Sequence, residues 1–141
     1  MLARLPTALE VQLQHDAQLS YVEYYVLAGL SEQPDHSMRL SELAVLTNAE
    51  LSRISHLVTR LEKRGYLRRV PHPGDRRCTN AVLTDEGYQH LRAAAPGHVA
   101  TVRSLVFDAL DDTELVTLKK CADQIISRIE PATRMTCRRD V

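Results

Sequence analysis

Cysteine is scarce in this chain, and the three that occur lie far apart, at Cys78, Cys121 and Cys137. An odd number, wide spacing and the lack of a CxxC pair argue against both a disulfide framework and a zinc ribbon. The six histidines are also scattered, with no HxxxH or HExxH spacing. We therefore expect no metal site and no cofactor.

Long hydrophobic runs are missing as well. The longest apolar stretch covers about residues 24–30, which is far too short to cross a bilayer. Because no long apolar run follows the first residues, we expect no signal peptide. The expected setting is the reducing cytoplasm, and no membrane partner is expected.

The motifs of common enzyme classes are absent too. The sequence has no GxSxG, no glycine-rich phosphate loop and no pair of carboxylates placed for acid–base catalysis. It has no internal repeat, and 44% of its 141 residues are hydrophobic. This composition predicts one packed domain that is not an enzyme.

The formal net charge is zero, but the charges are unevenly distributed. Residues 39–77 contain nine Lys or Arg and four Asp or Glu, a net charge of +5 that leaves −5 for the rest of the chain. A basic segment raises the local potential toward a polyanion such as nucleic acid. An ordinary solvated basic surface would show the same count.

Hydrophobic periodicity predicts two helices before the basic segment. The first covers about residues 7–17, and the second follows Ser20, which is suited to cap it. The second helix should end after Leu30, because residues 33–35 include a proline and break the pattern.

Two more helices are predicted within the basic segment. Ser41 is expected to cap a short helix over residues 41–46, and Asn48 a longer one over residues 49–64, with Glu50 in its first turn. The longer helix carries an apolar stripe at helical spacing, formed by Leu51, Ile54, Val58 and Leu61.

A β-hairpin is predicted after these helices. Gly65 stands where a left-handed helix cap is wanted, and the periodicity then changes. Residues 66–70 and 79–83 are predicted to pair as strands on either side of a turn at residues 72–75.

Two predicted helices remain toward the C-terminus. Thr84 is expected to cap a long helix that reaches about residue 110, kinked or broken at residues 96–97, which are Pro and Gly. The last helix opens at residues 111–114 and should stop at Pro131. Its apolar stripe consists of Leu115, Leu118, Ala122, Ile125 and Ile129.

Helix, short turn, amphipathic helix and basic hairpin follow one another in the order of a winged helix-turn-helix. The predicted fold is therefore mainly α with a small β-hairpin wing. In such a fold the second helix offers its polar face to the major groove, where Arg binds guanine and Ser, Thr and His contact phosphates or bases. The polar face here consists of Ser52, Arg53, Ser55, His56, Thr59 and Arg60.

The tip of the hairpin adds two guanidinium groups, those of Arg76 and Arg77. They serve no apolar purpose at a turn, and a narrow minor groove accepts arginine from a wing. Asp75 is expected to orient one of them through a charge-assisted hydrogen bond.

Several motifs, taken in order, resemble the multiple antibiotic resistance regulator (MarR) family. They are RLSELA at residues 39–44, LSR at 51–53, LEKRGYL at 61–67, PGDRR at 73–77 and LTDEG at 83–87. The resemblance covers about residues 39–91, and the combination is specific although each piece alone is weak.

The resemblance implies a homodimer that binds a pseudopalindromic operator on double-stranded DNA, usually as a repressor. It implies a DNA-binding lobe over about residues 32–90, dimerisation helices over 1–31 and 91–131, and a loose tail over 132–141. The implied dimer seam is the stripe of the last helix with Leu105, Val106 and Phe107. The implied DNA contacts are the six residues of the helix face together with Arg76 and Arg77.

The resemblance also implies an effector, a small phenolic or lipophilic molecule bound between the dimer region and the DNA-binding lobe. Tyr24, Tyr25 and His15 are candidates for lining such a pocket, although such aromatic residues belong more often to a core.

Two alternatives remain open from the sequence. One is a thiol-based redox regulator, for which Cys78 lies near the wing; Cys121, beside the stripe of the last helix, is expected to be buried and inert. The other is a winged-helix module that binds a protein rather than DNA. Salt separates the second alternative, since DNA binding weakens steeply with salt.

Overall fold

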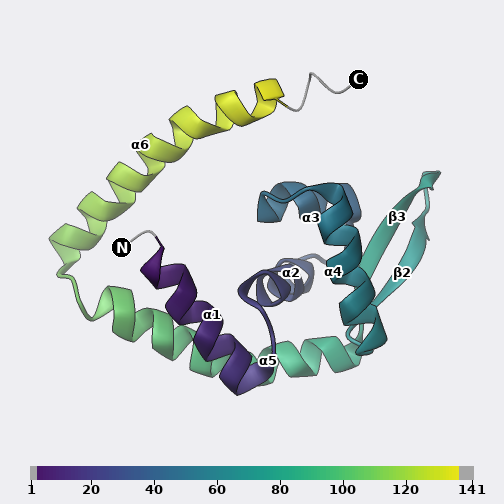
Figure 1. Cartoon of the computed structure of the whole chain (residues 1–141), viewed down its shortest axis with the longest axis horizontal. Coiled ribbons are helices and arrows are strands. Elements are labelled where there is room, and N and C mark those ends of the chain that lie inside the picture. The colour runs from purple at the N-terminus through teal and green to yellow at the C-terminus, as the bar shows by residue number, and fades with distance from the viewer. Residues whose placement is uncertain (1–2, 137–141) are drawn as a thin grey trace. The chain divides into compact units, whose positions relative to one another are not determined.

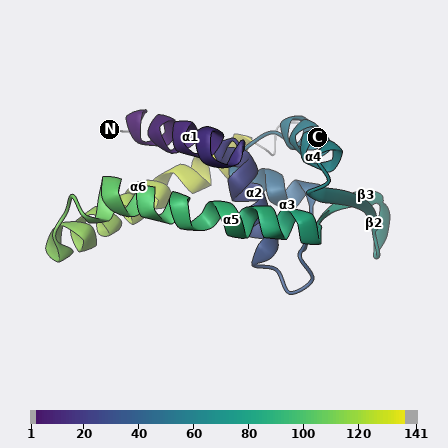
Figure 2. The same cartoon turned by 90° about the horizontal axis from the view of Figure 1, so that it is seen from below.

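The structure, a computed structural model, describes residues 3–136 and the side chains as far as Ile129. The chain divides into two compact bodies, residues 1–101 and residues 102–141. Figures 1 and 2 show their elements. In chain order these are α1 (Arg4–Ala17), α2 (Tyr21–Ser31), β1 (Ser37–Arg39), α3 (Leu40–Thr47), α4 (Leu51–Lys63), β2 (Leu67–His72), β3 (Asp75–Leu83), α5 (Asp85–Val102), a π-helical segment (Arg103–Phe107) and α6 (Asp112–Thr136).

The first two helices form where the sequence predicts them. α1 begins three residues earlier than expected and ends at Gln18, whose φ of 54° is left-handed. The Ser20 side chain accepts a hydrogen bond from the Glu23 backbone N–H, and the Glu23 carboxylate accepts one from the Ser20 N–H. This reciprocal pair is a capping box, so the predicted role of Ser20 is confirmed.

The caps of the next two helices differ from the prediction. α3 begins at Leu40, so Ser41 lies in its first turn and does not cap it. Asn48 does not cap α4; it ends α3 with a φ of 50°, a left-handed conformation that asparagine tolerates better than most residues. Glu50 is therefore the N-cap residue of α4 and not part of its first turn.

The buried face of α4 differs from the predicted stripe at one position. Ile54, Val58 and Leu61 are fully buried, but Leu51 is 53% exposed and Leu57 packs in the core in its place. Leu51 is the first residue of the helix and lies beyond the edge of the core. Positions 54, 57, 58 and 61 together form one continuous helical face.

The end of α4 is a Schellman motif, as Gly65 suggested. Gly65 has a φ of 80°, its N–H donates to the Glu62 carbonyl, and the N–H of Tyr66 donates to the Leu61 carbonyl. A left-handed residue is needed at this point to turn the chain from α4 into the hairpin.

The hairpin is confirmed and belongs to a three-stranded antiparallel sheet of order β1-β3-β2. Leu67 pairs with Leu83, and the chain reverses at Pro73 and Gly74. The third strand, β1, has only three residues, too few for the period-2 pattern that reveals a strand in a sequence.

Both long helices near the C-terminus pass through proline. The Thr84 side chain accepts from the Gly87 N–H and caps α5 as predicted. α5 continues through Pro96 to Val102, so the expected break is wrong, and the π-helical segment follows. α6 likewise passes Pro131 and reaches Thr136. Residues 137–141, with Cys137 and the end of the predicted tail, lie outside the described residues.

The first body contains a well-formed hydrophobic core between its helices and its sheet. The core residues come from α2, α3, α4, β2, β3 and α5, with Ala17 and Leu19 from the end of α1 and the link to α2. The largest fully buried side chains are Leu13, Leu19, Leu27, Leu30, Leu43, Ile54, Leu61 and Leu67. This core fixes the positions of α4 and of the base of the hairpin.

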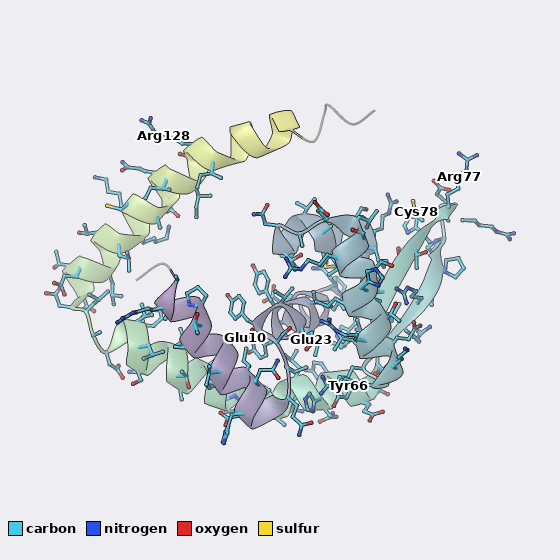
Figure 3. The ribbon with its side chains drawn as sticks, in the orientation of Figure 1. Glu10, Glu23, Tyr66, Arg77, Cys78 and Arg128 are labelled. Atoms are coloured by element: carbon cyan, nitrogen blue, oxygen red, sulfur yellow. The ribbon has the colours of Figure 1, made fainter. Side chains whose placement is uncertain are left out.

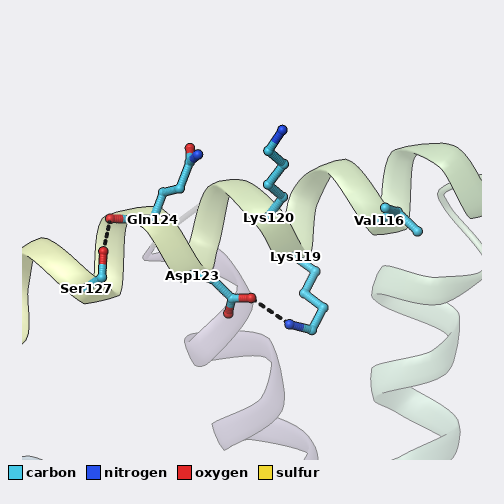
Figure 4. Close-up of a pocket in the computed structure, with 6 residues that line it drawn as sticks. All are labelled: Val116, Lys119, Lys120, Asp123, Gln124 and Ser127. Atoms are coloured by element: carbon cyan, nitrogen blue, oxygen red, sulfur yellow. Dashed lines mark hydrogen bonds and ion pairs between the residues drawn. The ribbon is translucent and has the colours of Figure 1, made fainter.

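The second body exposes its apolar side chains. Along α6, Ile125, Ile126 and Ile129 are each between 50% and 60% exposed. Figure 4 shows a mostly polar part of the same helix, where Lys119 and Asp123 form an ion pair one turn apart. Lys120, Gln124, Ser127 and one apolar side chain, Val116, lie beside the pair. α6 is therefore amphipathic.

Among residues 3–136, no helix combines the length and the apolar character needed to cross a membrane.

Candidate nucleic-acid interface

The first half of α4 presents polar side chains beside a groove. Ser52, Arg53 and His56 are exposed. They line a cavity of about 680 Å³ together with residues from α1, the start of α2 and the α3–α4 turn. The other lining residues are Glu10, Ser20, Val22, Thr47, Asn48, Ala49, Ile54, Leu57 and Arg60. A basic and hydroxyl-rich face at the N-terminal half of a helix suits phosphates and base edges.

Arg60, on the same face, forms an ion pair with α2. Its Nη2 lies 3.2 Å from Oε1 of Glu23, whose side chain is only 8% exposed. The other oxygen of Glu23 serves the capping box of α2. Arg60 itself remains 62% exposed, so its guanidinium is held in place and still reaches solvent.

Ser55 and Thr59 are half-buried and face the wing. Both hydroxyls accept hydrogen bonds from Nη2 of Arg69, at 3.3 Å for Ser55 and 3.0 Å for Thr59. Arg69 belongs to β2 and also pairs with Glu62 of α4. Sequence reasoning counted Arg69 only as part of the basic segment and missed this contact.

The tip of the wing carries two exposed arginines, Arg76 and Arg77, at the start of β3. Figure 3 shows Arg77 at the free end of the hairpin. Asp75 does not hold either guanidinium as predicted. Its Oδ1 accepts from the backbone N–H of Arg77 at 3.0 Å, which shapes the turn and leaves the arginine side chains in solvent.

The hairpin is joined to β1 through a chain of polar contacts that the sequence did not suggest. Nη2 of Arg39 lies 2.6 Å from Nε2 of His72, and Nδ1 of His72 lies 3.2 Å from Oδ1 of Asn80. The Asn80 amide in turn donates to the Ser37 hydroxyl. The chain crosses all three strands, and it fixes how the wing leaves the lobe.

The two described cysteines are both accessible. Cys78 on the wing is half-buried, with Sγ 3.8 Å from Oδ2 of Asp75. Cys121 is exposed in this chain, contrary to the expectation that it is buried, because the apolar side of α6 is itself uncovered.

The residues predicted to line an effector pocket between the dimer region and the DNA-binding lobe lie outside the cavity beside α4. None of Tyr24, Tyr25 and His15 lines the cavity beside α4. Tyr24 packs against His98 of α5 with ring centroids 4.4 Å apart, and His98 Nδ1 lies 3.0 Å from Oε1 of Gln12 in α1. Burial lowers the pKa of His98 and raises the pKa of Tyr24.

Among the described residues, no three His, Cys, Asp or Glu side chains gather closely enough to hold a metal ion. The site is built from cationic and hydroxyl side chains on a helix and a hairpin.

Comparisons with known proteins agree with this geometry. The sequence model of the MarR family matches residues 19–79. The transcriptional repressor MprA of Escherichia coli K12 is 30% identical over 107 residues, which are 76% of this chain and 60% of MprA. The chain thus matches less than two thirds of the length of this curated relative.

Two solved structures from Streptomyces coelicolor are similar over more of their length. Sco3205, a MarR family transcriptional regulator in complex with DNA, is 41% identical with a TM-score of 0.88, covering 91% of this chain and 83% of its own. AbsC, another MarR family transcriptional regulator, is 37% identical with a TM-score of 0.88, covering 92% and 87%. The identity to these two regulators, over most of their length, agrees with the winged helix-turn-helix fold. The chain therefore belongs to the MarR family.

Proposed function

We propose that this protein is a sequence-specific DNA-binding transcriptional regulator that acts as a homodimer, usually to repress, on a pseudopalindromic operator. The observation that carries the proposal is the pairing of a polar α4 face with a basic wing tip on one packed lobe. The similarity to Sco3205, whose structure contains DNA, supports it.

In the proposed complex, α4 enters the major groove and the wing reaches the neighbouring minor groove. Arg53 and His56, both exposed, are placed to meet base edges, with Ser52 nearer the phosphates. Arg60 would contribute from a fixed position because Glu23 holds it. Arg76 and Arg77 would enter the minor groove.

The proposed dimer would cover the exposed apolar side of α6. Leu105 and Phe107 of the π-helical segment are also exposed, at 45% and 53%, and we assign them to the same interface. Such a set of exposed side chains is typical of a protein–protein interface.

A small phenolic or lipophilic effector is part of the proposal. The cavity beside α4 has about 680 Å³, a volume typical of small-molecule sites. Arg53 and His56 line it, so an occupant there would contact the side chains that the proposal assigns to DNA.

The test is selection of bound duplexes from a random pool by the purified protein at two salt concentrations. The expected result is enrichment of an inverted repeat with half-sites about one helical turn apart. Arg53→Ala should then weaken binding to that repeat by about 1–3 kcal/mol and relax the preference at one base position. Failure to retain any duplex at low salt would remove DNA as the partner and favour a protein-binding winged helix.

A further inference from the structure

We propose that Arg69 is a positioning residue that holds the wing to the recognition helix, so that α4 and the hairpin meet DNA as one rigid unit. The inference rests on the proposed function, because it concerns how the same interface achieves specificity. It assigns a role to a residue that makes no DNA contact in the proposal.

The side chain of Arg69 spans the gap between β2 and α4 with four hydrogen bonds. Nη1 donates to Oε2 of Glu62 at 2.8 Å. Nη2 lies within donating distance of the Ser55 carbonyl at 2.7 Å, the Thr59 hydroxyl at 3.0 Å and the Ser55 hydroxyl at 3.3 Å. The acceptors span two turns of α4, so they fix both the distance and the angle of the strand.

The backbone at the same position is held as well. The N–H of Arg69 donates to Oε1 of Glu62 at 3.1 Å. Because β2 is at the edge of the sheet, an outward N–H there has no strand to pair with, and Glu62 supplies its acceptor. One carboxylate therefore grips both the main chain and the side chain of Arg69.

Only an arginine suits these acceptors. A guanidinium is a planar fork that can serve a carboxylate on one nitrogen and several oxygens on the other, whereas an ammonium is a single point. The neighbouring Arg68 has the same charge but is exposed and points to the other side of the strand. The two adjacent arginines thus form a natural pair of test residue and control.

This contact changes the expected role of Ser55 and Thr59. Their hydroxyls are engaged by Arg69, and Thr59 also donates to the Ser55 carbonyl at 3.0 Å. We therefore infer that these two residues influence DNA binding through Arg69 rather than by direct contact with bases.

A rigid link should matter most at the specific site. There, the contacts in the major groove and in the minor groove must form together. A wing that moves freely relative to α4 would form its contacts at a higher entropic cost, which lowers the affinity. Non-specific binding depends mainly on phosphate charge and should depend little on the link.

The experiment compares Arg69→Gln, Arg69→Lys and the control Arg68→Gln with the wild-type protein. Each is titrated with the selected inverted-repeat duplex and with a scrambled duplex of equal length, over a series of salt concentrations. Thr59→Val and the double variant Thr59→Val/Arg69→Gln complete a double-mutant cycle. Circular dichroism and thermal unfolding verify that each variant is folded.

The expected result is a loss of about tenfold or more in affinity for the inverted repeat in both Arg69 variants, the scale of a lost charge-assisted hydrogen-bond set. Affinity for the scrambled duplex and the salt slope should stay near the wild-type values. Arg68→Gln should keep the ratio of specific to non-specific affinity. Thr59→Val should weaken specific binding and add little to Arg69→Gln.

Three results would overturn the proposal. If Arg69→Gln weakens both duplexes alike and lowers the salt slope by about 1, Arg69 is a phosphate contact. If Arg69→Lys keeps the wild-type ratio of specific to non-specific affinity, a positive charge at this position is enough and the guanidinium geometry is not needed. If Thr59→Val and Arg69→Gln are additive, the hydroxyl does not act through the arginine.

Amide hydrogen exchange in the free protein separates this inference from the proposed function. The amides of β2 should exchange faster in Arg69→Gln than in Arg68→Gln, whether or not the wild-type protein binds DNA. Equal exchange in the two variants refutes the link even if the protein is a DNA-binding regulator. Lack of DNA binding by the wild-type protein refutes only the function.

Discussion

The two bodies of the chain differ in how far they bury their apolar side chains. In the first body, Leu27 and Ile54 are fully buried, whereas on α6 Ile125 and Ile126 are 60% and 50% exposed. The first body therefore completes its core from one chain, and α6 does not. The body that carries the proposed DNA-binding residues is fully packed within the monomer. The exposed apolar side of α6 is the surface that the proposed dimer would cover.

The largest expected effect comes from a substitution that creates a cavity in the hydrophobic core. Ile54→Ala should lower the free energy of unfolding by about 2–5 kcal/mol, because it removes a fully buried side chain. Chemical denaturation should give the same loss at every protein concentration. Ile125→Ala is the comparison on α6, and its effect should grow with protein concentration, as expected when a dimer stabilises the fold. A concentration-independent loss for Ile125→Ala would mean that α6 packs within its own chain.

A charge on the uncovered side of α6 should break the assembly and spare the lobe. Ile125→Asp should give a monomer by sedimentation and reduce affinity for the inverted repeat by about 100-fold, since two half-sites can no longer be held together. Gln124→Asp adds the same charge at the polar neighbour and should stay dimeric. Tight binding of the inverted repeat by a monomeric Ile125→Asp variant would contradict the dimer proposal.

Removing charge from the wing tip should weaken DNA binding and leave the dimer intact. Arg76→Ala and Arg77→Ala should each weaken all duplexes severalfold and lower the salt slope by about 1, with no change in oligomeric state. Arg128→Ala removes an equal charge from α6 and serves as control (Figure 3). Unchanged affinity of the wing variants at every salt concentration would show that the wing does not touch DNA.

The smallest expected effect is a pH dependence of stability that arises from His98 in the first body. Burial lowers the pKa of His98, so the unfolded chain binds a proton at a higher pH than the folded chain does. The contribution of His98 to stability should be fully present above its unfolded pKa of about 6.5 and decline as the pH falls below it. His98→Gln should flatten this dependence in denaturation measured between pH 7 and pH 5. An equally steep decline in the variant would assign the effect to other groups.

Local signals explain which parts of this fold are predictable from the sequence. Ser20, Gly65 and Thr84 all cap helices as expected, because capping depends on residues within one turn. For Asn48 the sequence predicts the wrong helix, because an asparagine suits both the end of one helix and the start of the next, and only the packing of α3 against α4 decides between them.

The candidate site was predictable in composition and less so in its internal contacts. The sequence marks Arg53 and Arg77 as exposed cations on a helix face and at a turn, and the structure places them so. It does not show that Glu23 holds Arg60, because these residues are 37 positions apart. Nor does it distinguish Arg68 from Arg69 in function, since their difference arises only when β2 lies against α4.

The hydrogen bond from the Arg69 N–H to Glu62, at the edge of β2, also affects solubility. A hairpin with an open edge offers unpaired N–H and C=O groups to the strand of another molecule, which is a common start of aggregation. Here α4 covers one edge of the sheet at Arg69, and the opposite edge is β1, only three residues long. These two features protect the protein from sheet-to-sheet association, and Glu62→Ala should promote precipitation before it unfolds the protein.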